Sequence, residues 1–154
     1  MVPFMSIEKD IQQSKFRNEY QKTVVNLIYT YNWVMEKHRQ FFERDDITSQ
    51  QFNILRILRG AGKPLSTLQI RQRMLDKMSD TSRIVDRLVK KDLVNKVICK
   101  TDRRLVDVSI SEKGMALLEK FDGYNEEMDG ILGNISEDEA RTLNELLDKM
   151  RTSA

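Results

Sequence analysis

Apolar residues recur at intervals of three and four between Phe16 and Phe42, and this spacing predicts a single long helix. At about 1.5 Å per residue, such a helix is roughly 40 Å long, which exceeds the width of a small domain. We therefore expect its apolar stripe to pack against more than the chain's own core, and a second subunit is the simplest candidate. The stripe consists of Phe16, Tyr20, Val24, Leu27, Tyr31, Val34, His38 and Phe41.

Capping signals predict three shorter helices after this one. Thr48 with Gln51 three residues later has the pattern of a capping box, and the segment 60–64 (GAGKP) ends the helix that follows. In the third of these helices, Ile84, Val85, Leu88 and Val89 form one buried face. The expected helices run from Thr48 to about Gly60, from Ser66 or Thr67 to about Met74, and from Ser79 to near Lys91.

The hydrophobic period then changes from that of helices to that of strands. Residues 94–100 and 105–110 are rich in β-branched side chains, and Val106, Val108 and Ile110 alternate with polar residues. The intervening residues 101–104 form a short charged hairpin loop. Ser111 caps a further helix to about Met128, and a capping box at 136–139 begins the last helix, which ends near residue 150.

Helix, short helix, turn, helix and hairpin is the order of a winged helix-turn-helix. We expect a mainly α fold with a small β-hairpin wing, flanked by helices at both ends of the chain. Residues 47–111 form the winged helix-turn-helix, and residues 1–46 and 112–154 form a helical dimerisation region.

The helix expected at 79–91 has the pattern of a DNA-recognition helix. Its cations fall opposite the buried face, and a major groove admits one α-helix in which arginine bonds guanine bidentately. Polar residues at its start are candidates for contacts with base edges or phosphates. A surface helix with solvated basic residues is the alternative. The candidate DNA contacts on this helix are Ser79, Asp80, Ser82, Arg83, Arg87 and Lys90.

The hairpin carries cations at or near its tip. Arginine at such a tip suits the enhanced negative potential of a narrow minor groove. Asp102 repels DNA by its charge, so we expect it to pair with Arg104 and orient that guanidinium. A charged turn without a function is the alternative. The basic residues of the hairpin are Lys96, Lys100, Arg103 and Arg104.

Charge and aromatic residues divide the chain into thirds. The net charge is zero over residues 1–54, +9 over 55–104 and −7 over 105–154, so the middle segment suits a polyanion. Nine of the eleven aromatic residues lie in the first 54, and the basic segment has none. Single-strand binders stack bases on aromatic side chains, so double-stranded DNA is the better candidate.

Several other classes of function lack the residues they need. The single cysteine, Cys99, excludes an internal disulfide and a Cys-cluster metal site, and one histidine makes a weak case for any metal. A Gly-rich phosphate loop and a Ser-His-Asp set are both missing, so we expect neither an enzyme nor a cofactor. We expect no membrane span and no signal peptide, and hence a cytoplasmic location.

Two segments resemble the MarR family of bacterial transcriptional regulators. Residues 102–114 (DRRLVDVSISEKG) are similar to the family's wing signature, and residues 82–94 (SRIVDRLVKKDLV) to its recognition helix and the exit from it. Asp92 stands where the family usually has glycine, so we expect that helix to end differently. The resemblance implies a homodimer on a pseudo-palindromic operator, usually acting as a repressor. It also implies Arg104 as the minor-groove residue, Asp102 as its positioner, and Ser82, Arg83 and Arg87 as recognition-helix contacts.

The resemblance further implies release from DNA by a small, often phenolic, effector. Tyr29, Trp33 and His38 are the candidate ligand-binding residues, although a core stripe explains the two aromatics equally well. For His38 the alternative is a buried imidazole satisfied by a neighbour. Cys99 lies in the first wing strand, where it is either a small buried hydrophobe or a site of oxidation.

We therefore expect a sequence-specific, homodimeric regulator of double-stranded DNA that responds to a small molecule. The alternative is a winged-helix protein–protein adaptor, which would not show a salt-dependent affinity for random duplex.

Overall fold

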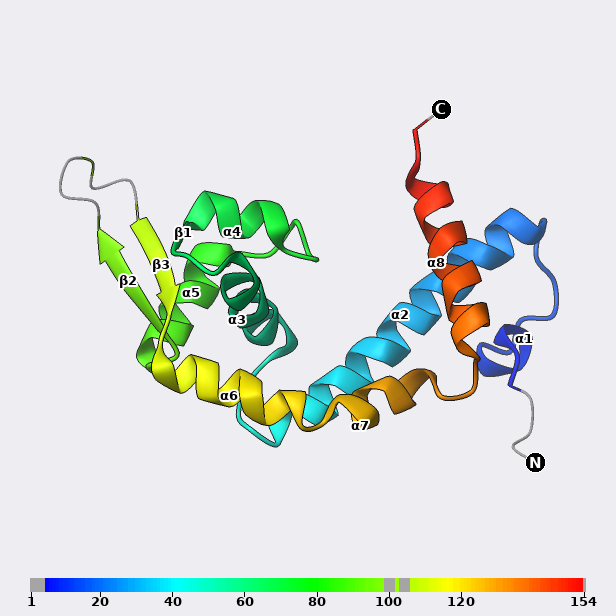
Figure 1. Cartoon of the computed structure of the whole chain (residues 1–154). Coiled ribbons are helices and arrows are strands. Elements are labelled where there is room, and N and C mark those ends of the chain that lie inside the picture. Colours follow the sequence, from blue (N-terminus) through cyan, green and yellow to red (C-terminus); the bar gives the residue numbers. More distant parts are fainter. Residues whose placement is uncertain (1–4, 99–101, 103–105, 154) are drawn as a thin grey trace. The chain divides into compact units, whose positions relative to one another are not determined.

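The structure is a computed structural model that describes residues 5–98, 102 and 106–153. The chain is mostly helical, with a small three-stranded antiparallel sheet (Figure 1), as expected from the sequence. It divides into two compact units, residues 1–52 and 53–154. In the described part of the chain, no helix combines the length and the apolar character that crossing a membrane requires.

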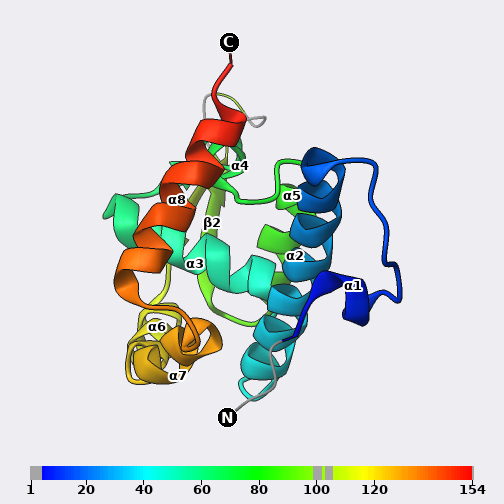
Figure 2. The same cartoon turned by 90° about the vertical axis from the view of Figure 1, so that its right-hand side faces the viewer.

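The first unit contains the long helix α2 (Glu19–Glu43), which confirms the predicted helix. It begins after Asn18, whose side-chain oxygen accepts a hydrogen bond from the backbone N–H of Gln21 at 2.9 Å. The short helix α1 (Ile7–Asp10) was not predicted and lies beside α2 in both views (Figure 2). An ion pair between Glu8 and Lys22 joins these two helices.

The apolar residues of α2 are buried only at its C-terminal end. Phe41 and Phe42 are buried, and the Phe42 ring stacks on Phe52 at 4.6 Å between centroids. Toward the other end Tyr20 is 83% exposed and Tyr31 is 59% exposed. Most of the predicted stripe is therefore available to a partner.

The second unit contains most of α3 (Ser49–Ala61) together with β1 (Leu65–Ser66), α4 (Thr67–Arg73) and α5 (Thr81–Lys90). The capping box before α3 is confirmed, because the Gln51 N–H donates to Thr48 Oγ1 at 3.1 Å and the Thr48 N–H donates to Gln51 Oε1 at 3.2 Å. A second capping box begins α4 at Ser66. The core around these helices includes Ile54, Leu55, Leu58, Leu65, Ile70, Leu88, Val108 and Leu118.

The start of α5 differs from the prediction by one residue. Asp80, not Ser79, is the N-cap, and its carboxylate accepts a hydrogen bond from the Arg83 N–H at 3.2 Å. The Ser79 hydroxyl instead donates to the Asp76 carbonyl at 2.8 Å. Asp and Ser are equally good N-caps, so the sequence did not decide between them.

The wing is formed by β2 (Val94–Ile98) and β3 (Val106–Ile110), which pair antiparallel with Lys96 opposite Val108. The strand order is β1-β3-β2, because Leu65 of β1 also pairs with Val108. The two-residue strand β1 was not predicted, since it is too short to show alternation. Val108 is fully buried between these neighbours, so the sheet closes one side of the core.

The end of α5 corrects the expectation drawn from Asp92. Asp92 adopts φ +60°, the left-handed conformation that glycine favours. The Leu93 N–H donates to the Leu88 carbonyl at 3.0 Å, and the Asp92 N–H donates to the Val89 carbonyl at 3.0 Å. These two bonds form a Schellman motif, so the helix ends as it would with glycine, at the cost of backbone strain.

The predicted helix from Ser111 to about Met128 is wrong in its length. Helix α6 (Glu112–Asp122) ends before Gly123, and α7 (Asn125–Asp129) and a 3-10 turn, η1 (Gly130–Leu132), follow. The last helix, α8 (Glu137–Arg151), begins with the predicted capping box at Ser136. No residue of α8 is buried, and its exposed apolar residues include Leu143, Leu146 and Met150.

Candidate nucleic-acid interface

Helix α5 presents one apolar face and one polar face. Ile84, Val85 and Leu88 are buried as predicted, whereas Val89 is only half-buried. The opposite face is exposed to solvent over the whole length of the helix. It carries Ser82, Arg83, Asp86, Arg87 and Lys90, which includes four of the predicted DNA contacts.

The two polar residues before α5 have local partners. The Asp80 carboxylate caps the helix, and its second oxygen lies 3.6 Å from Arg83 Nε. Ser79 is half-buried, with its hydroxyl on the Asp76 carbonyl. Both residues hold the start of α5 in place. That Ser79 and Asp80 also contact DNA remains a prediction.

The wing is linked to α5 by an ion pair that the sequence did not reveal. Lys96 Nζ on β2 lies 3.0 Å from Asp86 Oδ1 on α5. Lys96 therefore contacts α5, which corrects the expectation that it projects near the hairpin tip. Asp86 lies ten residues earlier in the chain and on a different element, so no helix or strand pattern in the sequence could predict this pair.

The remaining wing predictions fall largely outside the described residues. Cys99, Lys100, Arg103 and Arg104 lie outside them, whereas Asp102 is described and half-buried. The pairing of Asp102 with Arg104 therefore stays a prediction.

Helix α6 is held against the exit from α5. A Cβ at Gly114 would lie 2.3 Å from the Leu93 carbonyl oxygen, so only glycine permits this approach. The Ser111 hydroxyl donates to the Asp92 carbonyl at 2.7 Å, and Lys113 Nζ donates to the Lys91 carbonyl at 2.9 Å. These contacts fix the base of the wing relative to α5.

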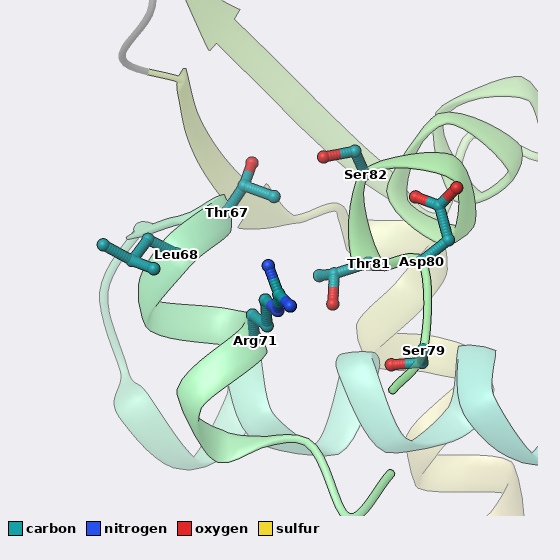
Figure 3. A pocket seen from close by; sticks show the side chains of 7 residues that line it. All are labelled: Thr67, Leu68, Arg71, Ser79, Asp80, Thr81 and Ser82. Atoms are coloured by element: carbon teal, nitrogen blue, oxygen red, sulfur yellow. The ribbon is translucent and has the colours of Figure 1, made fainter. Parts of the chain in front are cut away.

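A cavity of about 420 Å³ lies between α4 and the start of α5. Figure 3 shows Arg71 reaching from α4 toward Thr81, while Leu68 points away at the outer edge. No pattern in the sequence pointed to Arg71 or Thr81, because they lie on different helices and share no motif. The cavity is lined by Thr67, Leu68, Arg71, Ser79, Asp80, Thr81 and Ser82.

The three predicted ligand-binding residues do not converge on one side of α2. Tyr29 and Trp33 lie on the same side, about one turn apart, and are 40% and 41% exposed. His38 lies about half a turn away from Tyr29 around the axis. It is half-buried, its ring meets Phe42 edge-on at 5.7 Å, and this burial lowers the pKa of the imidazole. Ligand binding at these residues stays a prediction.

Metal-ligating side chains do not cluster in the part of the chain that the structure describes. Within residues 5–98, 102 and 106–153, no group of three or more His, Cys, Asp or Glu side chains is placed to hold a metal ion.

Comparison with known proteins shows a resemblance to the MarR family. The model of the MarR family matches residues 47–106, which hold α3, α4, α5 and the wing. The structure of a mutant MarR from Escherichia coli in complex with operator DNA is 25% identical, with a TM-score of 0.76, over 90% of this chain and 100% of that chain. Residues 47–106 therefore match the MarR family, and the chain shares the fold of MarR.

Two further matches are also transcriptional regulators. The HTH-type transcriptional regulator MhqR of Bacillus subtilis (strain 168) is 27% identical over 135 residues, which cover 86% of this chain and 92% of MhqR. An organohalide-sensing regulator, solved in its 2,4-dichlorophenol-bound form, shares the fold at 18% identity with a TM-score of 0.79, over 90% of this chain and 85% of that chain. The predicted resemblance to the MarR family is confirmed, and the proteins matched are transcriptional regulators rather than enzymes.

Proposed function

We propose that this protein is a homodimeric repressor that binds a pseudo-palindromic operator in double-stranded DNA. Residues 47–111 bind DNA, and residues 1–46 and 112–154 hold the dimer together. The observation that carries this proposal is the exposed face of α5, where Arg83, Arg87 and Lys90 stand opposite a buried apolar face.

Helix α5 enters the major groove in this proposal. Arg83 and Arg87 are exposed and one turn apart on the same face, so both reach base edges or phosphates from one docking position. Each bidentate contact of an arginine with guanine discriminates by about 1–3 kcal/mol. The wing follows the backbone into the adjacent minor groove, where Arg104 is the proposed contact.

The exposed apolar surfaces of α2 and α8 support a homodimer. Tyr20, Val24 and Tyr31 on α2, and Leu146 and Met150 on α8, are each more than half exposed. Two helices that leave such residues in water gain stability when a second copy covers them. Two identical modules about 34–36 Å apart then read the two halves of a palindrome.

The effector in this proposal is a small molecule, and phenolic acids are the first class to test. Its candidate binding residues are Tyr29, Trp33 and His38. The expected location is the cytoplasm, where the operator would be accessible.

Fluorescence anisotropy with a random duplex, measured over increasing salt, tests DNA binding. Counterion release predicts a steep linear fall of log K with log salt, because several lysines and arginines neutralise phosphates. A flat response would favour the protein–protein adaptor instead. Sedimentation at twice the chain mass of 18.1 kDa tests the dimer, and a monomer at micromolar concentration would contradict it.

A further inference from the structure

We propose that Asn53 of α3 is a positioning residue that fixes the turn between α4 and α5, and thereby the direction in which α5 meets DNA. The part of this inference that concerns DNA rests on the proposed function. The part that concerns the turn does not, because it describes the protein without DNA.

The turn between α4 and α5, residues 74–80, is attached to the core by its first residue (Figure 1). Met74 caps the end of α4 and is 2% exposed. The four residues that follow are exposed, with Leu75 at 82% and Met78 at 91%. Within the turn, the Met78 N–H donates to the Asp76 carboxylate at 2.9 Å. Because this bond is local, it closes the turn but does not place it on the rest of the fold.

Asn53 holds Met74 by a directional bond. Its side chain is 5% exposed, and its Nδ2 donates to Met74 Sδ at 3.7 Å. Its Oδ1 accepts a hydrogen bond from Arg56 Nη2 at 2.9 Å. A guanidinium has donors only, so Arg56 requires the oxygen of the amide and leaves the nitrogen for the sulfur. The buried amide therefore has one defined orientation.

An amide is more costly to bury at this position than an apolar side chain. Its neighbours on α3, Ile54 and Leu55, are apolar and fully buried. Methionine has a flexible side chain that adapts to apolar surroundings in several rotamers. A hydrogen bond to its sulfur selects one rotamer, and satisfied polar groups in a core specify a unique packing. Asn53 thus defines a single path for the backbone that follows Met74.

Three substitutions and one combination separate positioning from folding. Asn53→Leu removes the amide and keeps a branched side chain, so Tm should stay unchanged or rise. Met74→Leu removes the sulfur and leaves the amide nitrogen unpaired, so Tm should fall, and adding Asn53→Leu should restore it. Thr81→Val is the matched control. It removes a buried hydroxyl at the other end of the turn, and this hydroxyl has no hydrogen-bond partner in the described part of the chain.

The first measurement is amide hydrogen exchange of the protein without DNA, followed by NMR. The Met78 and Ser79 amides report on the turn, since both donate to Asp76. We expect Asn53→Leu to speed their exchange about fivefold while the Leu93 amide, at the other end of α5, keeps the wild-type rate. Thr81→Val should leave the Met78 and Ser79 amides at the wild-type rate.

Two results of this set would overturn the positioning role. The first is exchange in Asn53→Leu that is unchanged at Met78 and Ser79 or equally fast at Leu93. The second is a double variant no more stable than Met74→Leu, since the amide and the sulfur would then not interact.

The second measurement is competition between an operator selected from a random pool and a random duplex. Asn53→Leu should lower the preference for the operator about fivefold, whereas affinity for random duplex and its salt slope should stay unchanged, because no cation is removed. Thr81→Val should keep the preference. If the wild-type protein binds no duplex, the proposed function fails, and the exchange rates alone decide whether Asn53 positions the turn. A faster-exchanging turn with an unchanged operator preference would refute the role of Asn53 in reading DNA.

Discussion

Lys96 Nζ lies 3.0 Å from Asp86 Oδ1, and this contact joins the first strand of the wing to the polar face of α5. Both residues lie on the surface that we propose to face DNA. The ion pair holds a cation of β2 against α5, so the two elements that we propose to contact DNA are coupled through side chains as well as through the backbone.

We expect Asp86→Asn to reduce the preference for a specific operator over random duplex several-fold, because Lys96 is released from α5. Stability should change by less than about 1 kcal/mol, since exposed ion pairs contribute little. Denaturation and competition binding measure the two effects. Asp107→Asn on β3 is the control with the same change in charge, and an equal loss of preference in both variants would contradict the coupling.

Asp92→Gly should stabilise the protein by up to about 1 kcal/mol. Asp92 holds a left-handed conformation that costs energy for any residue with a Cβ. Glycine removes that cost, but it loses more conformational entropy on folding, which offsets part of the gain. Urea denaturation measures the change. Lys91→Gly, at φ −88°, should be destabilising instead. A decrease in stability for Asp92→Gly would contradict this prediction, because it would show that the Asp92 side chain stabilises the fold by more than its left-handed backbone destabilises it.

Gly114→Ala should destabilise the protein by about 1–3 kcal/mol, although alanine is the better helix former. The added Cβ meets the Leu93 carbonyl, which is backbone and cannot move aside without disturbing the start of β2. Gly130→Ala is the control, because nothing lies within 4 Å of a Cβ at that position. In thermal unfolding, Gly114→Ala should lower Tm, whereas Gly130→Ala should leave Tm unchanged or raise it.

His38 should make stability fall as the pH drops below about 6.5. Burial lowers its folded-state pKa below the ordinary value of 6.5, so the unfolded chain binds more protons in this range. Its contribution is complete above 6.5 and is lost as the pH falls through the folded-state pKa. The carboxyl groups with lowered pKa values, Glu8, Glu36 and Glu139, titrate below 4.5 and affect a lower range.

Denaturation midpoints at several pH values measure this effect. His38→Gln should show a flatter profile than the wild type as the pH falls below about 6.5. Identical profiles in the two proteins would contradict the assignment to His38, which is the only histidine in the chain.

Local signals in the sequence were sufficient to predict the helices that position the proposed DNA-binding surface. The capping boxes at Thr48 and Ser136, and the apolar face at Ile84, Val85 and Leu88, depend on residues three or four apart, and all are confirmed. The end of α6 at Asp122 was missed, because the apolar pattern continues past Gly123 and does not show that the helix stops there.

Contacts between elements distant in sequence could not be predicted in the same way. Lys96 meets Asp86, and Arg71 approaches Thr81, only because the fold brings separate elements together. The conformation of Asp92 was also missed, because a residue with a Cβ argued against the left-handed region, whereas the turn into β2 requires it. In each case tertiary packing decided the outcome.

Selection of duplexes from a random pool by the purified protein tests the central claim most directly. We expect the enriched sequences to contain an inverted repeat whose half-sites lie about 10 base pairs apart, since two copies of α5 read successive major grooves. Arg83→Ala should relax the preference at one position in each half-site, at about 1–3 kcal/mol per contact. A pool without enrichment, or a motif without two-fold symmetry, would contradict the account.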